Sequence, residues 1–292
     1  MKIKSTILPI SLLGIFAALS ASGPAFGSSN FQIAPPPIAY PYFESGKTDS
    51  KVEPAYIDVK ATDFSLKGGG VNFDSRHAFS DSIAADVQGG IFALNGEMPG
   101  VPPITPIPAY SGGTFLGYWM PQATGKAKVT VTSVQMSINL EFQPFHNDSG
   151  GLIVFGGPSL GVMNMVMNTP YSLTFGATTN SGYTDTLTIS SVTTGLQVGL
   201  QGDITLARNL KISPFLMTSS YSGTSTLKDD PNVSTASGYS TTADIPSYSS
   251  SSMGMDIVIG NLSIGTLLQQ MKSQKNSSDN VKVTMLRMGY RF

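Results

Sequence analysis

The sequence predicts an all-β fold, a transmembrane antiparallel up-and-down β-barrel of about ten strands. Three observations predict it. Long segments alternate between apolar and polar residues, as strands with one face in lipid and the other in a lumen must. No run of about 18 or more apolar residues follows Gly27, so helical membrane spans are not expected. The connections between strands alternate between short and long, which suits a barrel with tight turns at one end and extended loops at the other.

The first 27 residues are expected to be an export signal. Lys2 and Lys4 precede an apolar run over about residues 7–19, and small residues lead up to Gly27. This run is shorter than the ~20 residues of a membrane-spanning helix. The pattern is typical of a cleaved secretory signal peptide, residues 1–27.

A Pro-rich stretch follows the export signal. Residues 28–54, which contain Pro35-Pro36-Pro37, are predicted to be a semi-rigid periplasmic segment. A plug inside the barrel is the alternative that the composition leaves open. The barrel itself is expected over residues 55–292.

The alternation is clearest in two segments. In residues 134–143 every even position is apolar and every odd position is polar, and residues 196–206 repeat the pattern with few exceptions. A soluble β-sandwich or a lipocalin-like barrel also shows such alternation. The segment length, on the order of 10 residues, favours the membrane barrel because a tilted strand needs that length to cross the hydrocarbon layer.

Counting the chain reversals gives ten strands. An even number places both ends of a closed antiparallel barrel on the periplasmic side. The segment Lys67-Gly68-Gly69-Gly70 also fits a bulge within one strand, so totals of eight and twelve stay open. The expected strands are 55–66, 69–78, 83–95, 127–143, 151–166, 184–206, 210–221, 250–259, 262–271 and 281–292.

Residues that favour tight reversal mark the short turns, at 79–81, 146–150, 207–209 and 260–261. The long connections are expected at 96–125, 168–183, 222–252 and 272–280. They are rich in Pro or in Ser, Thr and Tyr, compositions that resist a packed core of their own. The cluster Phe115-Leu116-Gly117-Tyr118-Trp119 fits a binding patch or a strand extension, and the extension is favoured.

The polar faces of the strands carry charges of both signs. Because charges in a narrow interior cannot stay unpaired without a large desolvation cost, we expect salt-bridged networks and a plugged or very narrow lumen. The predicted lumen charge network comprises Asp74, Arg76, Asp86, Glu141, Asp203, Lys211, Asp256, Arg287 and Arg291.

The C-terminal residues carry a resemblance. Phe292 ends the chain, and the positions two, four and six residues earlier are Tyr290, Met288 and Leu286. This pattern resembles the terminal strand of bacterial outer-membrane β-barrel proteins, a superfamily that includes small OmpA/OmpX-like and porin-like barrels. In that superfamily the barrel assembly machinery is understood to recognise these positions. The resemblance therefore implies that the four residues form an assembly signal.

The same resemblance implies a location and a setting. It implies a protein of a Gram-negative type of outer membrane, in contact with outer-membrane lipid and with both termini in the periplasm. A monomer is expected. The resemblance implies no activity, because one barrel scaffold hosts pores, adhesins, receptors and enzymes.

The composition excludes several functions. The formal net charge is −1, which leaves no basic surplus for nucleic acid. The chain has no Cys and only His77 and His146 as histidines. Both lie beside expected turns, where a turn or an interfacial role explains them more simply than catalysis. The run Gly68-Gly69-Gly70 has no helix after it, so it does not fit a phosphate loop. No catalytic, metal or cofactor site is predicted.

Three roles are consistent with these observations. The expected role is structural or that of a narrow passive channel for small solutes. The alternative is a surface-exposed adhesin or receptor that acts through its long loops. An outer-membrane enzyme is the least favoured. The sequence identifies neither a solute nor a ligand.

Overall fold

The computed structural model describes residues 32–39, 43–61, 64–104, 107–233, 236, 238–273 and 280–292. The export signal predicted at residues 1–27 lies outside this part of the chain. Among the described residues, no helix is long and apolar enough to cross a membrane.

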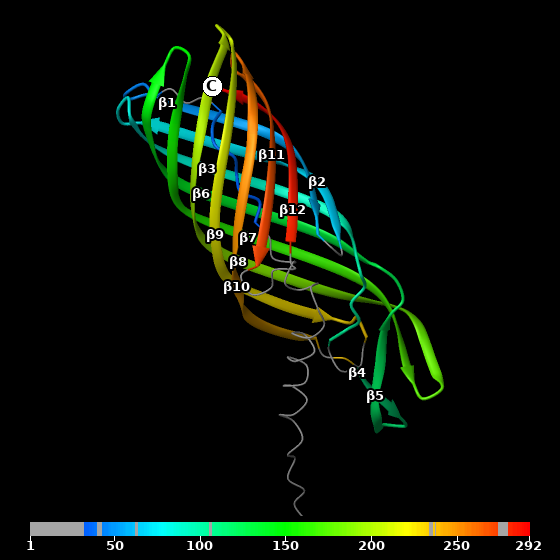
Figure 1. Cartoon of the computed structure of the whole chain (residues 1–292). Helices are drawn as coiled ribbons and strands as arrows, with labels where there is room; N and C mark the ends of the chain where they lie inside the picture. The colour runs from blue at the N-terminus through cyan, green and yellow to red at the C-terminus, as the bar shows by residue number, and fades with distance from the viewer. Residues whose placement is uncertain are drawn as a thin grey trace, which may run out of the picture.

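Ten strands of the described chain close into one antiparallel barrel (Figure 1). Its wall runs β1–β2–β3–β6–β7–β8–β9–β10–β11–β12, and β12 pairs with β1 to complete it. The wall strands are β1 (Thr48–Lys60), β2 (Ser65–Ala78), β3 (Ile83–Met98), β6 (Ala127–Asn147), β7 (Gly150–Phe175), β8 (Thr178–Ala207), β9 (Leu210–Asp230), β10 (Tyr239–Ile259), β11 (Leu262–Ser273) and β12 (Asn280–Arg291). The predicted all-β transmembrane barrel of about ten strands is confirmed.

Two further strands, β4 (Ile107–Ser111) and β5 (Thr114–Ala123), form a hairpin outside the wall. Residues 120–123 of β5 pair with residues 171–174 at the far end of β7. Figure 1 shows this hairpin at the end of the barrel away from the C-terminus. The expected loop 96–125 therefore contains a structured hairpin, and its aromatic cluster belongs to β5.

The four short turns lie where the sequence predicts them, between β2 and β3, β6 and β7, β8 and β9, and β10 and β11. The first reversal is different. The chain turns between Lys60 and Ser65, and the three glycines lie inside β2 in unbroken register with β1. They are neither a turn nor a bulge. A Cβ on Gly68 would lie 1.9 Å from the carbonyl oxygen of Ala93, so the close approach of β3 explains the glycine there.

The N-terminal segment also differs from the prediction. Residues 32–39 are buried inside the barrel instead of extending outside it, and β1 begins at Thr48, ahead of the predicted strand. We call residues 32–39 the plug. Its three prolines cannot donate hydrogen bonds to a sheet, and polar side chains of the wall bond its backbone groups instead.

The outward apolar residues form a belt around the half of the barrel that contains the short turns. We call this set the apolar belt. Such a band facing outward is typical of strands that cross a membrane. Its exposed members are Val52, Tyr56, Val71, Phe73, Ile83, Val87, Ile91, Val134, Met136, Ile138, Leu140, Phe142, Leu152, Leu160, Val162, Val192, Leu196, Val198, Leu200, Ile204, Leu206, Leu216, Met253, Met255, Ile257, Ile259, Leu262, Ile264, Leu268, Leu286, Met288 and Tyr290.

Beyond the belt the polarity of the wall inverts. On β6 the outward residues change from Val134 to Thr132, Thr130 and Lys128, while the inward residues change from buried Gln135 and Ser133 to buried Val131 and Val129. The strands continue far past the belt, so β7, β8, β9 and β10 occupy much of the predicted loops 168–183 and 222–252. The lumen is therefore polar within the belt and apolar beyond it.

Candidate functional site

The polar half of the lumen holds two tight groups of charged side chains. Arg76 donates to both carboxylate oxygens of Glu141, with one nitrogen–oxygen distance of 2.9 Å. Arg287 binds Asp256 at 2.7 Å and Glu53 at 3.3 Å, and Lys51 lies 3.0 Å from Glu53. All are buried, so each charge is compensated by a partner within a few ångströms.

The remaining predicted network residues lie near these groups or closer to the short turns. Asp74 lies opposite Lys51, and Asp86 lies opposite Arg76, in the register of the sheet. Lys211 pairs with Asp203 at 3.6 Å, and Arg291 pairs with Asp49 at 3.9 Å. Eight of the nine predicted side chains are buried in the lumen, and Arg291 is partly exposed at its mouth.

Sequence reasoning missed the acids and the base of β1. Asp49, Lys51 and Glu53 all join the network, but they fall within residues 28–54, the segment predicted to be a semi-rigid periplasmic one. The signal that would have found them is the alternation of Val52, Pro54 and Tyr56 with those three charged residues. Pro54 obscures it, because a proline argues against a central strand.

The plug crosses this polar lumen and bonds to wall residues on several strands. The Gln269 side chain on β11 donates to the carbonyl of Gln32 at 2.9 Å and accepts from the backbone N–H of Ala34 at 3.3 Å. Gln201 on β8 donates to the carbonyl of Ile38, and Lys51 donates to that of Pro37 at 3.4 Å. The plug therefore satisfies its backbone through side chains of the wall.

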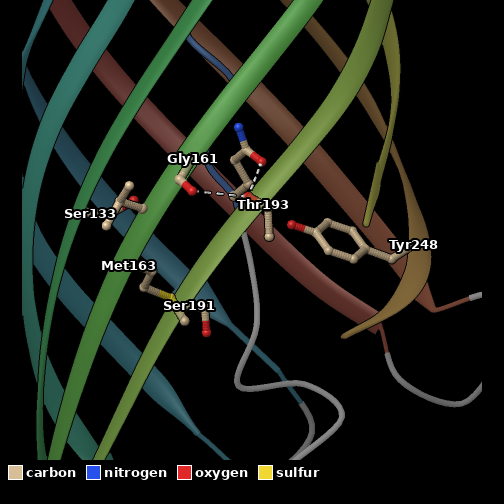
Figure 2. Close-up of a pocket in the computed structure, with 8 residues that line it drawn as sticks. Ser133, Gly161, Met163, Ser191, Thr193 and Tyr248 are labelled. Carbon is tan, nitrogen blue, oxygen red and sulfur yellow. Dashed lines mark hydrogen bonds between the residues drawn. The ribbon is translucent and has the colours of Figure 1, made fainter. Parts of the chain in front are cut away.

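A small cavity lies beside the plug where the lumen changes from polar to apolar (Figure 2). The Thr193 hydroxyl donates to Gln32 Oε1 at 2.9 Å and lies 3.4 Å from the carbonyl oxygen of Gly161. The volume is about 10 Å³, and the rest of the lining is Ser133, Val162, Met163, Ser191 and Tyr248. This is close to the room that one water molecule needs, so the cavity does not make a path through the barrel.

A larger hollow opens beside the short turns, where the C-terminus also lies. We call it the vestibule. Its volume is about 630 Å³, and it carries bases and acids together. His146 and Asp148, two residues apart at the β6–β7 turn, both line it. The full lining is Phe43, Glu44, Lys47, Asp81, His146, Asp148, Thr205, Arg208, Lys211 and Arg291. Its size and polarity suit a small charged solute.

A pair of buried acids lies at the other end of the barrel. Asp185 on β8 is seven residues beyond Val192, the last belt residue of that strand, and lies outside the membrane-spanning part. Burial, and then the charge of Asp229, raise the pKa of Asp185 to about 8. Asp229 accepts from the backbone N–H of Ile104 at 3.1 Å. This bond ties the connection after β3 to the end of β9.

The predicted assembly residues share one face. Leu286, Met288 and Tyr290 point outward on β12, and Phe292 is exposed just after it. Their role in assembly stays a prediction. In the part of the chain that the structure describes, no three His, Cys, Asp or Glu side chains gather in a way that could hold a metal ion.

Comparison with known proteins supports the fold. No family model and no curated protein matches the sequence. The structure is similar to the outer membrane protease OmpT from Escherichia coli, with a TM-score of 0.51 and 8% identity over 91% of this chain and 100% of that chain. It is also similar to the outer membrane protein OprG from Pseudomonas aeruginosa, with a TM-score of 0.39 and 11% identity over 86% of this chain and 98% of that chain.

These similarities concern architecture. At 8% identity the similarity to OmpT shows the fold of a bacterial outer-membrane β-barrel and nothing about catalysis.

Proposed function

We propose that the protein is an integral protein of a Gram-negative type of outer membrane, with periplasmic termini, and that it acts at the cell surface rather than as a channel. The observation that carries the proposal is the filled lumen. The plug and the ion pairs occupy its polar half, and buried Val, Leu, Ile and Met side chains occupy the half beyond the belt. A barrel filled in this way offers little room for solutes.

The β4–β5 hairpin is the surface that supports the binding role. Tyr110, Phe115 and Tyr118 are 56%, 50% and 58% exposed, although large rings are usually more buried. Phe115 stacks edge-on against both tyrosines, with ring centroids 5.8 and 5.2 Å away. Ser111, Gly112 and Gly113 complete the turn. Rigid rings among small polar residues are a composition that binds protein surfaces well.

A narrow channel is the second candidate, and the vestibule is the observation that favours it. A polar hollow of about 630 Å³ at the periplasmic mouth gives a small solute a place to enter. Transport would then require the plug to leave the lumen.

Planar-bilayer recording on refolded protein separates these two roles. We expect the full chain to give no discrete conductance steps, because the plug and the apolar half block ions. Reproducible single-channel steps from the full chain would overturn the surface proposal in favour of the channel.

Adhesion of cells that display the protein tests the hairpin. We expect Phe115→Ser with Tyr118→Ser to reduce adhesion to protein-coated surfaces at least about fivefold, since exposed aromatic anchors carry much of the energy of an interface. Phe79→Ser, which removes an exposed ring from the β2–β3 turn, is the matched control and should leave adhesion unchanged. Equal adhesion of all three proteins at equal display would count against the hairpin.

A further inference from the structure

Four exposed lysines lie on the outer wall just beyond the apolar belt. They are Lys272 on β11, Lys282 on β12, Lys60 on β1 and Lys67 on β2, and we call them the lysine band. On each strand the lysine lies four residues beyond the last belt residue, which is Leu268, Leu286, Tyr56 or Val71. Four residues of a tilted strand rise by roughly 10 Å, so the ammonium groups reach the headgroup layer of the membrane.

Two of the lysines are direct neighbours in the sheet, while Lys67 lies opposite Asp58 and Lys272 lies opposite Asn280. Lys60 and Lys282 are direct partners in the register of β1 and β12, and like charges in directly opposed positions repel each other. Asp58 lies 3.3 Å from Lys60 and is the direct partner of Lys67 in the register of β1 and β2, so it offsets part of the charge of both lysines. At the same distance beyond the belt, β8 and β10 carry Thr188 and Ser249 instead. The positive charge is therefore concentrated on the β11–β12–β1–β2 side.

An apolar groove lies in the outer wall directly beside the band. Its volume is about 420 Å³, and it crosses β2, β3, β6 and β7. Gly69 and Ala93 leave it open at the end near Lys67, while Val71 and Ile91 line it within the belt. Its position at the edge of the belt suits the end of an acyl chain next to its headgroup.

We propose that the lysine band and this groove together bind a phosphorylated glycolipid of the outer leaflet. The proposal rests on the proposed orientation, which puts the long connections outside the cell. Phosphate groups offset the repulsion between Lys60 and Lys282, and one acyl chain fills the groove. The band spans four strands, roughly 15 Å at the usual strand spacing. That width suits a sugar headgroup with two phosphates better than the single phosphate of a phospholipid.

Titration of the detergent-purified full chain with bis-phosphorylated lipid A, followed by native mass spectrometry, tests the band. A lysine near anionic lipid contributes about fivefold in affinity. We therefore expect Lys60→Gln, Lys67→Gln and Lys282→Gln together to weaken lipid A binding about a hundredfold. Lys228→Gln, an outward lysine farther along β9, is the matched control and should change affinity less than twofold.

The groove has its own test. Ala93→Phe fills it from the outer face and should weaken lipid A binding severalfold, whereas Ala85→Phe, on the same face of β3 but outside the groove, should not. Equal binding of lipid A by the wild type and the triple lysine variant would overturn the proposal. Equal affinity of the wild type for phosphatidylglycerol and lipid A would overturn the glycolipid assignment. Neither readout depends on conductance or adhesion, so the proposed function can fail separately.

Discussion

Arg287 shows how a single residue holds the polar lumen together. Its guanidinium binds Asp256 and Glu53 at once, and its carbon Cζ lies 5.3 Å from the centre of the Phe215 ring. These contacts join β12, β10, β9 and β1 across the interior. Because Arg287, Glu53 and Asp256 are all buried, water cannot solvate the two carboxylates when the arginine is lost.

Replacing Arg287 by Met should therefore destabilise the barrel strongly. Leaving two buried acids without their shared cation costs about 3–5 kcal/mol. Thermal unfolding in detergent, followed by circular dichroism, measures the loss. The double variant Arg287→Met with Asp256→Asn removes one acid as well, while Glu53 keeps its ion pair with Lys51 at 3.0 Å, and it should recover most of the stability. A single variant as stable as the wild type would show that the ion pairs do not hold the barrel.

Asp185 should make the end of the barrel away from the short turns sensitive to pH. Its pKa in the folded protein is about 8, above the ~3.9 of an unfolded aspartate. The folded state therefore binds the proton more tightly, and the stability that this proton contributes is complete below about pH 4 and is lost as the pH rises to about 8.

Hydrogen exchange of the ends of β7, β8 and β9 near Asp185 between pH 5 and 9, corrected for the intrinsic exchange rate, measures this effect. We expect protection to fall with rising pH in the wild type and to change much less in Asp185→Asn. Thr188→Asn, on the outward face of β8, is the control and should follow the wild type. Identical profiles for wild type and Asp185→Asn would contradict the assignment.

At the scale of elements, the plug and the strand ends beyond the belt could not be predicted from the sequence. The belt halves of the strands are predictable because apolar outward faces alternate with polar inward ones. Beyond the belt the two faces exchange polarity, as between Val134 and Val131 on β6. The outward face beyond the belt is rich in Ser and Thr, and this composition predicts a loop when only the sequence is considered. Residues 32–39 carry no alternation, and only contacts with distant residues such as Gln269 fix their place.

Removing the plug should open the polar lumen to water. The chain contains no Cys, so an introduced cysteine reports its own surroundings. Ser250 is buried and accepts from the Gln269 side chain at 2.7 Å, next to the plug. We expect a membrane-impermeant thiol reagent to label Ser250→Cys slowly in the full chain and at least about tenfold faster after deletion of residues 32–39.

A cysteine at Arg208, in the β8–β9 turn, should react quickly in both backgrounds and serves as the control. Slow labelling of Ser250→Cys in the deletion variant would mean that side chains of the wall fill the lumen without the plug.

At the scale of the whole molecule, one continuous sheet faces lipid along one half of its length and has a polar exterior along the other half. Each strand pairs residue by residue with the next, so the register can be followed once around the barrel. The path starts at Val198 on β8 and returns to the same strand at Thr186. The successive partners between them are Thr218, Ser251, Gln270, Lys282, Lys60, Ser65, Glu97, Lys128 and Asn168. The start and the end of this path differ by twelve residues along β8, from 198 to 186. This displacement is the shear of the barrel, which the tilt of its strands requires. The strands thus run from the lipid-facing half into a half with a hydrophobic core and a polar exterior.

This division predicts opposite responses on one face of one strand. Val198 lies within the belt on β8, and Thr188 lies outward beyond it. Val198→Arg should cost about 2–4 kcal/mol, because the charge must enter the hydrocarbon layer. Thr188→Arg places the same charge at the headgroup layer, outside the hydrocarbon, and should change stability by less than about 0.5 kcal/mol. Equilibrium urea unfolding in lipid vesicles measures both.

The inward residue beside Thr188 should behave as a residue of a hydrophobic core. Ile189 is buried in the apolar core beyond the belt, so Ile189→Ala should cost about 2–5 kcal/mol, as in the core of a soluble protein. If the hydrocarbon layer instead covered the whole length of β8, Thr188→Arg would be as costly as Val198→Arg. Equal costs at these two positions would place the membrane boundary beyond Thr188, and the lysine band would then lie within the hydrocarbon layer instead of at its edge.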